Sequence, residues 1–390
     1  MLEKIKSLSR EYLVDVVSIR RHLHANPELS FKEFNTSKFV QEKLKAWGIP
    51  FTPGIAGTGV VALIKGSGHG PRKALRADMD ALPIIEENEV AYKSTVRGVM
   101  HACGHDVHTA SLLGAARILH DLKDEWKGEV QLIFQPGEEV LPGGASLMIA
   151  EGIFEEKMPQ AIFGQHVYPE LPAGKVGFKP GKYMASTDEL YVTVKGKGGH
   201  GAKPHRNIDP VLISAHLIVA LQQAVSRWAD PAIPTVLSFG KVLAHGATNI
   251  IPNEVTLEGT FRTFDETWRK EAHRRIIQCA TDLVKSMGGE VDFRIEVGYP
   301  VLHNHEALTL AAKQRAIEYL GSENVVDLDL RMTAEDFAYY SHHMPACFYR
   351  LGTAAPDGSC AYAVHNSRFD IDEHALEIGM GLMAWEAVAE

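Results

Sequence analysis

Cysteine is scarce in this sequence. Four cysteines are spread over 390 residues, at positions 103, 279, 347 and 360. So few thiols at such wide spacing do not make the disulfide framework of small secreted domains, and they fit a reducing compartment. We therefore predict a cytoplasmic protein.

Long apolar runs and an excess of positive charge are also missing. Nowhere do ~18 apolar residues follow one another, so no transmembrane helix is expected. Residues 1–24 are charged and amphipathic, without the apolar centre of a signal peptide. The net charge is −9, and lysine and arginine do not gather into a stripe. Neither a membrane nor a nucleic acid is therefore an expected partner.

The remaining composition is that of an ordinary globular protein. The chain is 45% hydrophobic and 23% charged, which is close to the average for such proteins. Single hydrophobic cores seldom grow beyond roughly 250 to 300 residues. A chain of 390 residues is therefore expected to form two or three domains.

The apolar pattern predicts an α/β fold with an insertion. Short strands are expected at 59–65, 73–77 and 130–134, with a helix at 109–122. From Asp188 the pattern changes to strand, helix, two strands, helix and strand, which is a split βαβ unit. We predict that residues 1–183 and 300–390 form one discontinuous domain, and that residues 184–299 form an inserted βαββαβ, ferredoxin-like domain.

Several metal-binding residue types fall within residues 100–108. Cys103, His105, Asp106 and His108 are separated by few other residues, and Gly104 removes a Cβ that would limit how closely the backbone bends around an ion. Side chains two apart share a face where the backbone is extended. On that assumption the cysteine and the first histidine reach one point in space.

Further ligand types follow predicted strands. Asp78 and Asp80 come after the strand at 73–77, and Glu138 and Glu139 come after the strand at 130–134. His166 is expected near the end of a strand that begins at residue 161. The end of a strand is where α/β proteins keep their sites. Because adjacent residues of an extended segment point opposite ways, one glutamate can bind a metal while the other holds a water.

Three later segments carry candidate residues. His365 lies in a polar loop near the carboxyl terminus and is a candidate fifth ligand. His200 stands between glycines in the loop 198–202, and Asn249 lies in the polar turn 248–252. Residues 333–336, Thr-Ala-Glu-Asp, are interpreted as a helix N-cap with acids in the first turn.

Nine ordered sequence blocks resemble one known family. They are LRADMDALPI (75–84), MHACGHDVHTA (100–110), FQPGEE (134–139), GQHV (164–167), GGHGAKPH (198–205), NIIPNEV (249–255), GTFRTF (259–264), TAEDFAYY (333–340) and VHN (364–366). Together they span nearly the whole chain. The sequence resembles the M20 metallopeptidase family, specifically the amidohydrolase branch of hippurate hydrolases, indole-acetyl-amino-acid hydrolases and N-acyl-amino-acid deacetylases.

The resemblance implies two divalent metal ions per subunit, bridged by a cysteine. Its implied ligands are Cys103, His105, Glu139, His166 and His365, with Cys103 as the bridge. Glu138 would be the general base, and Asp80 would orient the ligands. A thiolate with imidazoles suits Zn²⁺, Co²⁺ or Ni²⁺, while carboxylates also admit Mn²⁺.

The resemblance also implies a role for the inserted domain. His200, Asn249 and Arg262 would contact the substrate, partly across a dimer interface. The insert would serve as a lid and a dimerisation domain, which gives a homodimer or a tetramer. The expected reaction is hydrolysis of the amide bond of an N-acyl-L-amino acid, with a dipeptidase or aminoacylase of the same fold as the alternative.

The chemistry of amide hydrolysis agrees with this assignment. Two metal ions can acidify a water and polarise the carbonyl, which are the two difficulties of the reaction. Glu138 would take the proton and deliver it to the leaving amine. His200 is the candidate donor to the developing oxyanion. Arg262 suggests that the substrate carries a free α-carboxylate.

Two other readings of the sequence are open. One is a thiol hydrolase with Cys103 as the nucleophile and His105 or His108 as the base. The other is a catalytically silent metal-binding protein that has kept the fold. Loss of activity on chelation would distinguish the metal enzyme from the first, and an assay with N-acyl-amino acids would distinguish it from the second.

Overall fold

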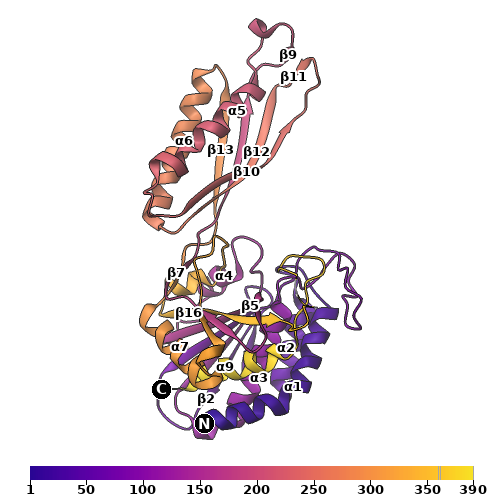
Figure 1. Cartoon of the computed structure of the whole chain (residues 1–390), viewed down its shortest axis with the longest axis vertical. Coiled ribbons are helices and arrows are strands. Elements are labelled where there is room, and N and C mark those ends of the chain that lie inside the picture. Colours follow the sequence, from indigo (N-terminus) through magenta and orange to yellow (C-terminus); the bar gives the residue numbers. More distant parts are fainter. Residues whose placement is uncertain (359, 361, 390) are drawn as a thin grey trace. The chain divides into compact units, whose positions relative to one another are not determined.

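The computed structural model describes residues 1–358, 360 and 362–389 (Figure 1). The described chain divides into two compact units. The first comprises Met1–Tyr183, His303–Leu330 and the residues from Asp336 onward, and the second comprises Met184–Leu302 and Arg331–Glu335. Both combine helices with sheets, so the predicted α/β class is confirmed.

An eight-stranded sheet forms the centre of the first unit. In spatial order its strands are β1 (Phe51–Ile55), β2 (Gly59–Lys65), β4 (Glu129–Gln135), β3 (Arg72–Asp78), β5 (Ala161–Pro172), β16 (Ala346–Ala354), β6 (Val176–Phe178) and β15 (Val325–Asp327). The four central strands β4, β3, β5 and β16 run parallel. Their carboxyl ends therefore meet at one edge of the sheet, where α/β folds place ligands.

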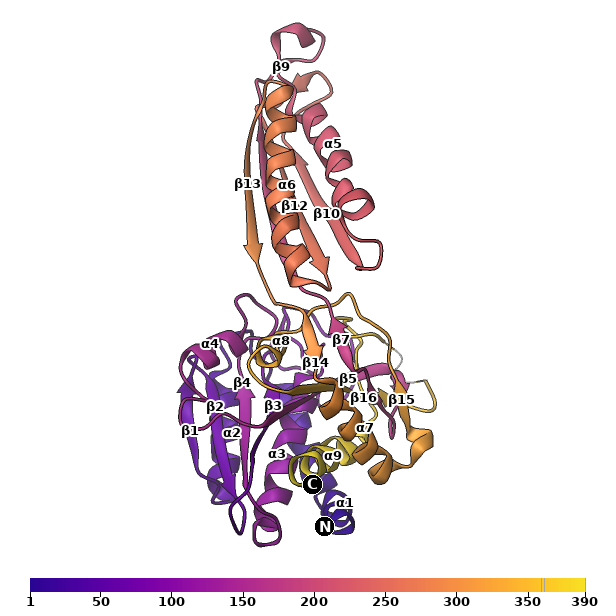
Figure 2. The same ribbon diagram turned by 90° about the vertical axis from the view of Figure 1, so that its left-hand side faces the viewer.

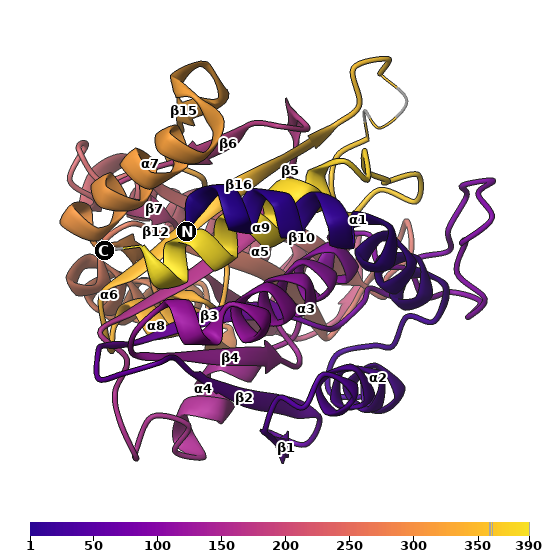
Figure 3. The ribbon, with the colours of Figure 1, turned by 90° about the horizontal axis from the view of Figure 1, so that it is seen from below.

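Helices pack on this sheet. The longer ones are α1 (Leu2–Ala25), α2 (Phe34–Ala46), α3 (His105–Asp121), α7 (Glu306–Leu320) and α9 (Ala375–Val388). Short elements are η1 (Lys123–Glu125), α4 (Gly144–Ala150), η4 (Ser322–Asn324) and α8 (Ala338–Ser341), and β7 (Gly181–Met184) pairs with β14 (Leu302–Asn304). Helices α1, α3 and α9 lie side by side over one face of the sheet (Figures 2 and 3).

Helix α3 is buried on nearly all sides. Its apolar residues include Val107, Leu112 and Leu113, each 0% exposed. A Cβ at Gly114 would lie 2.8 Å from Met380 Cβ of α9 and 3.0 Å from Val16 Cγ2 of α1. The three helices therefore approach closely at a glycine in the middle of α3, and this packing holds α3 between α1 and α9.

The second unit has the predicted βαββαβ order. Its elements are β8 (Asp188–Lys195), α5 (Pro210–Leu221), β10 (Thr235–Ala244), β12 (Glu254–Thr263), α6 (Glu266–Ser286) and β13 (Glu290–Val297), and the sheet order is β10-β12-β8-β13. All neighbouring strands are antiparallel. Smaller elements are β9 (Gly199–His200), paired with β11 (Ile250–Ile251), the turn η2 (Pro204–Arg206) and the π-helix η3 (Ala224–Trp228).

Both helices of the second unit pack on one face of its sheet (Figure 2). Leu190 and Val192 of β8 share a core with Leu217 of α5 and Ile276 of α6. The alternation of buried and exposed residues along β8 is what an antiparallel sheet with one covered face requires. No helix in the described part of the chain combines the length and apolarity needed to cross a membrane.

The predicted helix start at residues 333–336 is wrong. These residues have no helical conformation, and the nearby helix α8 begins only at Ala338 after Phe337 as its N-cap. The Asp336 carboxylate instead accepts hydrogen bonds from Arg76 Nη2 at 2.6 Å and from the backbone N–H of Ala145 at 2.9 Å. The acid that was expected in the first turn of a helix is therefore the partner of a buried arginine.

A buried ion pair joins three elements of the second unit. Asp188, at the start of β8, accepts hydrogen bonds from Arg269 of α6 through Nη2 at 2.6 Å and through Nε at 3.0 Å. Arg269 Nη2 also donates to the carbonyl of Gly298, after β13. Burial raises the pKa of Asp188, but His273 and Arg269 outweigh it, so the pKa lies below its ordinary value. The ionised Asp188 therefore stabilises the folded protein fully at a pH above the pKa of an aspartate in the unfolded chain. This stabilisation is lost as the pH falls through the lower pKa of Asp188 in the folded protein.

Replacement of Arg269 by Met is expected to lower the free energy of unfolding by about 3–5 kcal/mol, because Asp188 would stay buried without a partner. The matched control is Lys241→Met, which removes a pair with Glu258 whose side chains are 56% and 45% exposed. That loss should be under about 1 kcal/mol. Equilibrium urea denaturation followed by circular dichroism measures both. Equal losses for the two variants would contradict the importance of the buried pair.

Candidate metal centre

All five predicted ligands lie in the first unit and come from four segments. Cys103 and His105 stand at the start of α3, Glu139 follows β4, His166 lies in β5 and His365 precedes α9. Their ligand atoms form two overlapping groups in which all atoms lie within 4.8 Å of one another: Cys103, His105 and His166, and Cys103, Glu139 and His365. Cys103 is common to both groups, as a bridging ligand would be.

The backbone around Cys103 differs from the predicted extended conformation. Gly104 adopts a left-handed conformation with φ of 78°, and α3 begins at His105. A Cβ at position 104 would lie 2.5 Å from Val167 Cγ2. The prediction of an extended Cys-Gly-His segment was therefore wrong, because a tight turn before the helix brings the two ligands together.

The donor atoms of the predicted ligands converge on one place. Cys103 Sγ lies 3.4 Å from His166 Nε2, and Glu139 Oε1 lies 3.2 Å from His365 Nε2 and 3.9 Å from His105 Nε2. Within the described residues, the buried atom His105 Nε2 has no hydrogen-bond partner, and Glu139 Oε1 has only the histidine contacts just named. Buried polar atoms nearly always have a hydrogen-bond partner. A thiol, imidazoles and a carboxylate that converge in this way fit a divalent metal site.

His166 does not lie at a strand end. Strand β5 continues to Pro172, so that part of the prediction was wrong. However, β3 pairs with β5 only from Ala161 to Gly164. The histidine therefore lies just beyond the end of this pairing. Its Nδ1 contacts the carbonyl of Val167 at 2.8 Å, so this nitrogen carries the proton and Nε2 faces Cys103.

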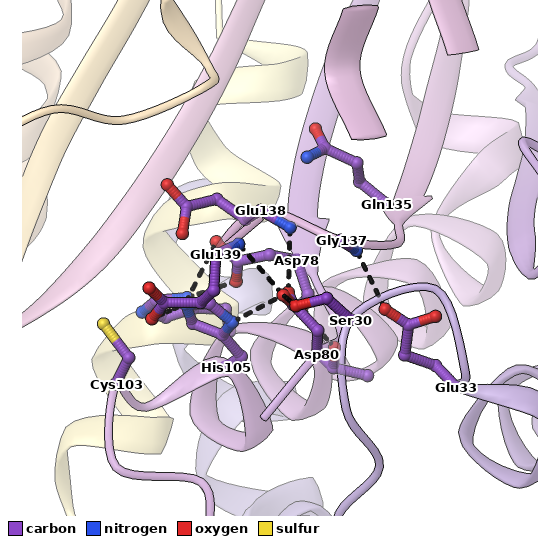
Figure 4. A network of polar contacts seen from close by, with 12 residues as sticks. Ser30, Glu33, Asp78, Asp80, Cys103, His105, Gln135, Gly137, Glu138 and Glu139 are labelled. Carbon is purple, nitrogen blue, oxygen red and sulfur yellow. Dashed lines mark hydrogen bonds and ion pairs between the residues drawn. The ribbon is translucent and has the colours of Figure 1, made fainter. Parts of the chain in front are cut away.

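Asp80 connects a ligand to the turn after β4 (Figure 4). Its Oδ1 lies 3.2 Å from His105 Nδ1 and accepts a hydrogen bond from the backbone N–H of Glu138 at 3.1 Å. Its Oδ2 accepts a hydrogen bond from the backbone N–H of Glu139 at 3.0 Å. Burial raises the pKa of Asp80, but the hydrogen bond and charge of His105, together with the hydrogen bonds from Ser30 and the Glu139 N–H, outweigh it and hold the pKa below its ordinary value. An ionised Asp80 fixes the proton of His105 on Nδ1, which leaves Nε2 directed at the other ligand atoms.

His108 has a structural role beside the site. Its Nε2 accepts a hydrogen bond from the backbone N–H of Val167 at 2.9 Å, and its Nδ1 lies 2.6 Å from Asp78 Oδ1. Burial lowers the pKa of His108, which favours the neutral ring with its proton on Nδ1. Both nitrogens are therefore engaged away from Cys103, which argues against His108 as the base of a thiol hydrolase.

Glu138 is 6% exposed and lies next to the ligands. One of its oxygens lies within 4.8 Å of ligand atoms of His105 and Glu139. Its Oε1 accepts a hydrogen bond from the backbone N–H of Asp336 at 3.4 Å. In Figure 4 the side chain of Glu139 extends toward Cys103 and His105, and Glu138 lies beside it. The two glutamates therefore occupy different positions, but they do so on a turn and not on an extended strand.

The sequence interpretation missed a buried polar network under the site. Arg76 Nη1 donates to Asp78 Oδ2 at 2.7 Å, and Arg76 Nε donates to Gln135 Oε1 at 2.9 Å. Gln135 Nε2 in turn donates to Asp336 Oδ2 at 2.8 Å. Arg76 is 1% exposed. An arginine in the middle of a predicted buried strand was the available signal, because such a charge needs buried partners.

The predicted substrate residues all lie in the second unit. His200 is in β9, Asn249 precedes β11 and Arg262 is in β12. His200 Nδ1 accepts a hydrogen bond from the backbone N–H of Ala202 at 3.0 Å, so the neutral ring carries its proton on Nε2 and can donate from there. Arg262 Nη1 donates to the carbonyl of Met332 at 3.1 Å. The roles of these residues stay predictions.

Known proteins resemble this chain over most of its length. It is 41% identical over 361 residues to the N-acetyl-L-cysteine deacetylase of Bacillus subtilis (strain 168), which covers 93% of this chain and 84% of that protein. It is 43% identical over 304 residues to the N-acyl-L-amino acid amidohydrolase of Geobacillus stearothermophilus, covering 78% and 82%.

A solved structure is similar in fold. It is the Bacillus subtilis protein YXEP, described as a dinuclear metal binding peptidase from the M20 family, with a TM-score of 0.83 and 34% identity over 97% of this chain and 98% of that chain. The family model described as Peptidase family M20/M25/M40 matches residues 74–385. Because this model and these relatives cover most of its length, the chain belongs to peptidase family M20/M25/M40.

Proposed function

We propose that this protein hydrolyses the amide bond of N-acyl-L-amino acids to a carboxylic acid and a free amino acid. The chain is a hydrolase of the M20 family, and two relatives above 40% identity are named for the removal of acyl groups from amino acids. The observation that carries the proposal is the convergence of five potential metal ligands beside the buried carboxylate of Glu138. A dipeptidase or aminoacylase of the same fold is the alternative.

The proposed cofactor is a pair of divalent ions. Cys103, His105 and His166 would hold one ion, and Cys103, Glu139 and His365 the other. Mn²⁺ and Zn²⁺ fit this mixture of thiolate, imidazole and carboxylate, and Co²⁺ or Ni²⁺ are compatible. When bound, the ions would acidify a water and polarise the amide carbonyl.

Glu138 is the proposed general base. Its carboxylate would take a proton from the attacking water and deliver it to the leaving nitrogen. The contact with the backbone N–H of Asp336 limits where the carboxylate can move. Asp80 holds the turn from the other side through the N–H groups of Glu138 and Glu139.

Residues of the second unit are proposed to bind the substrate. His200 would donate from Nε2 to the developing oxyanion, a type of interaction that is worth about 3 to 4 kcal/mol where such donors have been removed. Arg262 would bind the free α-carboxylate, and Asn249 would contact the substrate beside it. An enzyme with such a carboxylate site acts on acyl-amino acids rather than inside peptides.

A panel of N-acetyl-L-cysteine, N-acetyl-L-methionine and N-benzoylglycine tests the proposal, with the corresponding α-amides as matched controls. The acids are expected to be hydrolysed and the amides much more slowly, because the amides lack the carboxylate. Chelation should abolish the activity, and Mn²⁺ or Zn²⁺ should restore it. Activity that survives chelation would favour a thiol hydrolase that uses the contact between Cys103 and His166. Equal rates on acids and amides would contradict the carboxylate site.

Glu138→Gln is expected to retain both metal ions and to lose ~10²–10⁴-fold in kcat, because an amide cannot accept the proton. Glu139→Gln is the matched control on the adjacent residue, and it should lose metal because a proposed ligand has been changed. Metal content by mass spectrometry and initial rates measure the two effects. A metal-free Glu138→Gln protein would show that the roles of the two glutamates are reversed.

The proposed assembly is a homodimer, or a tetramer built from two such dimers, that forms through the second unit in the cytoplasm. The strands β10 and β13 are the edges of its sheet. On α5, Val211, Leu212 and Val219 are 42%, 52% and 72% exposed. An exposed apolar helix face beside open strand edges supports pairing with a second copy.

His200 is proposed to act in the active site of the partner subunit. His200→Ala and Glu138→Gln proteins should each be nearly inactive, yet regain activity when they are unfolded and refolded together. After random pairing, about half of all dimers in the mixture are heterodimers, and each heterodimer has one working site out of two. The activity of the mixture should therefore approach roughly a quarter of wild type. Native mass spectrometry confirms that heterodimers form. A mixture of confirmed heterodimers with no more activity than its parents would place His200 in its own subunit's site or outside catalysis.

A further inference from the structure

Glu33 is a fully buried carboxylate that the proposed mechanism does not use. It lies at the N-cap position of α2 and is 0% exposed. Its Oε2 accepts a hydrogen bond from Thr58 Oγ1 at 2.6 Å. Its Oε1 accepts two more, from the backbone N–H groups of Phe31 at 2.8 Å and Gly137 at 2.8 Å. The last of these reaches the turn that carries Glu138.

Buried carboxylates bind three consecutive backbone donors of this turn (Figure 4). The N–H of Gly137 donates to Glu33, and the N–H groups of Glu138 and Glu139 donate to the two oxygens of Asp80. Hydrogen bonds to charged acceptors are shorter and stronger than those between neutral groups. Glu33 therefore holds one end of the turn, and Asp80 holds the remainder.

The packing of Phe31 against Gly137 depends on the same carboxylate. Gly137 has φ of 58°, and a Cβ at this position would lie 2.4 Å from the Phe31 ring. Phe31 itself has φ of 62°, which is uncommon for a residue with a large side chain. Its N–H donates to Glu33 Oε1, the oxygen that also receives the Gly137 N–H. One oxygen atom therefore fixes both partners of this close contact.

Ser30, which precedes Phe31, also contacts the residues that hold the turn. Ser30 Oγ donates to Asp80 Oδ2 at 2.6 Å. The segment from Ser30 to Glu33 therefore contacts the turn in three ways: through Asp80, through the Phe31 ring and through the Glu33 carboxylate. These residues lie far from the metal ligands in the sequence and bind none of the ligand side chains in these contacts.

We propose that Glu33 is a positioning residue for the reaction, and that it acts on Glu138 through the backbone of Gly137. This inference rests on Glu138 as the proposed general base. Without the Glu33 carboxylate, Gly137 would lose its anchor, and a glycine is free to adopt many conformations. A displacement of about 1 Å in a catalytic group can cost ~10²-fold in rate.

Glu33→Ala is expected to lower kcat about tenfold to a hundredfold with N-acetyl-L-methionine as the probe, and to leave KM and metal content near those of the wild type. Glu33→Gln should recover most of kcat, because its amide oxygen can still accept from Phe31 and Gly137, while its NH₂ group can donate to Thr58. If Glu33→Ala does not fold, Glu33→Asp replaces it. The shorter side chain keeps the charge but withdraws the acceptor from Gly137.

Thr58→Val is the matched control. It removes the hydrogen bond to Oε2 and leaves the Oε1 contacts in place, so it should lower the melting temperature without a comparable loss of kcat. Loss of metal in Glu33→Ala, equal kcat losses in Thr58→Val and Glu33→Ala, or an unchanged kcat in Glu33→Ala would each overturn the proposal. So would a Glu33→Gln protein as slow as Glu33→Ala.

Amide hydrogen exchange of the peptide 134–140 provides a readout that does not depend on activity. In metal-free protein, this peptide should exchange faster in Glu33→Ala than in the wild type, and at the wild-type rate in Thr58→Val. Unchanged exchange in Glu33→Ala would overturn the proposal even if no probe is hydrolysed. Failure of the wild type on all N-acyl-amino acids, with the expected exchange, would contradict the proposed function alone.

Discussion

The Asp80 carboxylate is the contact on which the candidate site depends. It is 1% exposed, and it joins the ring of His105 to the backbone of the turn that carries Glu138 and Glu139. A buried carboxylate is costly unless it is paired or hydrogen-bonded. The cost of burying Asp80 is offset by hydrogen bonds from His105 and from the backbone N–H groups of Glu138 and Glu139, which all reach the one carboxylate. The candidate ligand His105 on α3 and the turn after β4 are therefore held in a fixed relation by Asp80.

A second buried cluster holds the far end of the chain against the same helix. Arg20 Nε donates to Asp106 at 2.7 Å, and Arg20 Nη2 donates to Asp370 at 2.8 Å. Asp106 directly follows the candidate ligand His105, and Asp370 follows the segment that carries His365. The backbone N–H of His365 also donates to the carbonyl of Ala102 at 2.7 Å. Candidate ligands more than 250 residues apart in sequence are thereby brought to one place by buried ion pairs and hydrogen bonds.

Much of the fold could be predicted because the apolar pattern follows the regular periods of strands and helices. Strand β2 was predicted at residues 59–65, which are its bounds, and the βαββαβ order of the second unit was predicted in full. The strand β16 was missed, although it pairs with β5 beside His166. Its place in the sheet depends on a parallel pairing across more than 180 residues, and no local pattern encodes such a pairing.

The residue types at the site were determined by the sequence, but their geometry was decided by the tertiary structure. Cys103, His105, Glu138 and Glu139 could be chosen because their chemistry suits a metal and a base. The way in which these side chains converge could not be predicted from the sequence. A left-handed glycine at position 104 and a bend at Gly137 replace the extended backbone that was assumed. Nor could the sequence reveal which acidic residues are buried as partners of buried arginines. Asp336 was expected in the first turn of a helix, yet it pairs with Arg76, because a buried guanidinium requires a buried carboxylate as its partner.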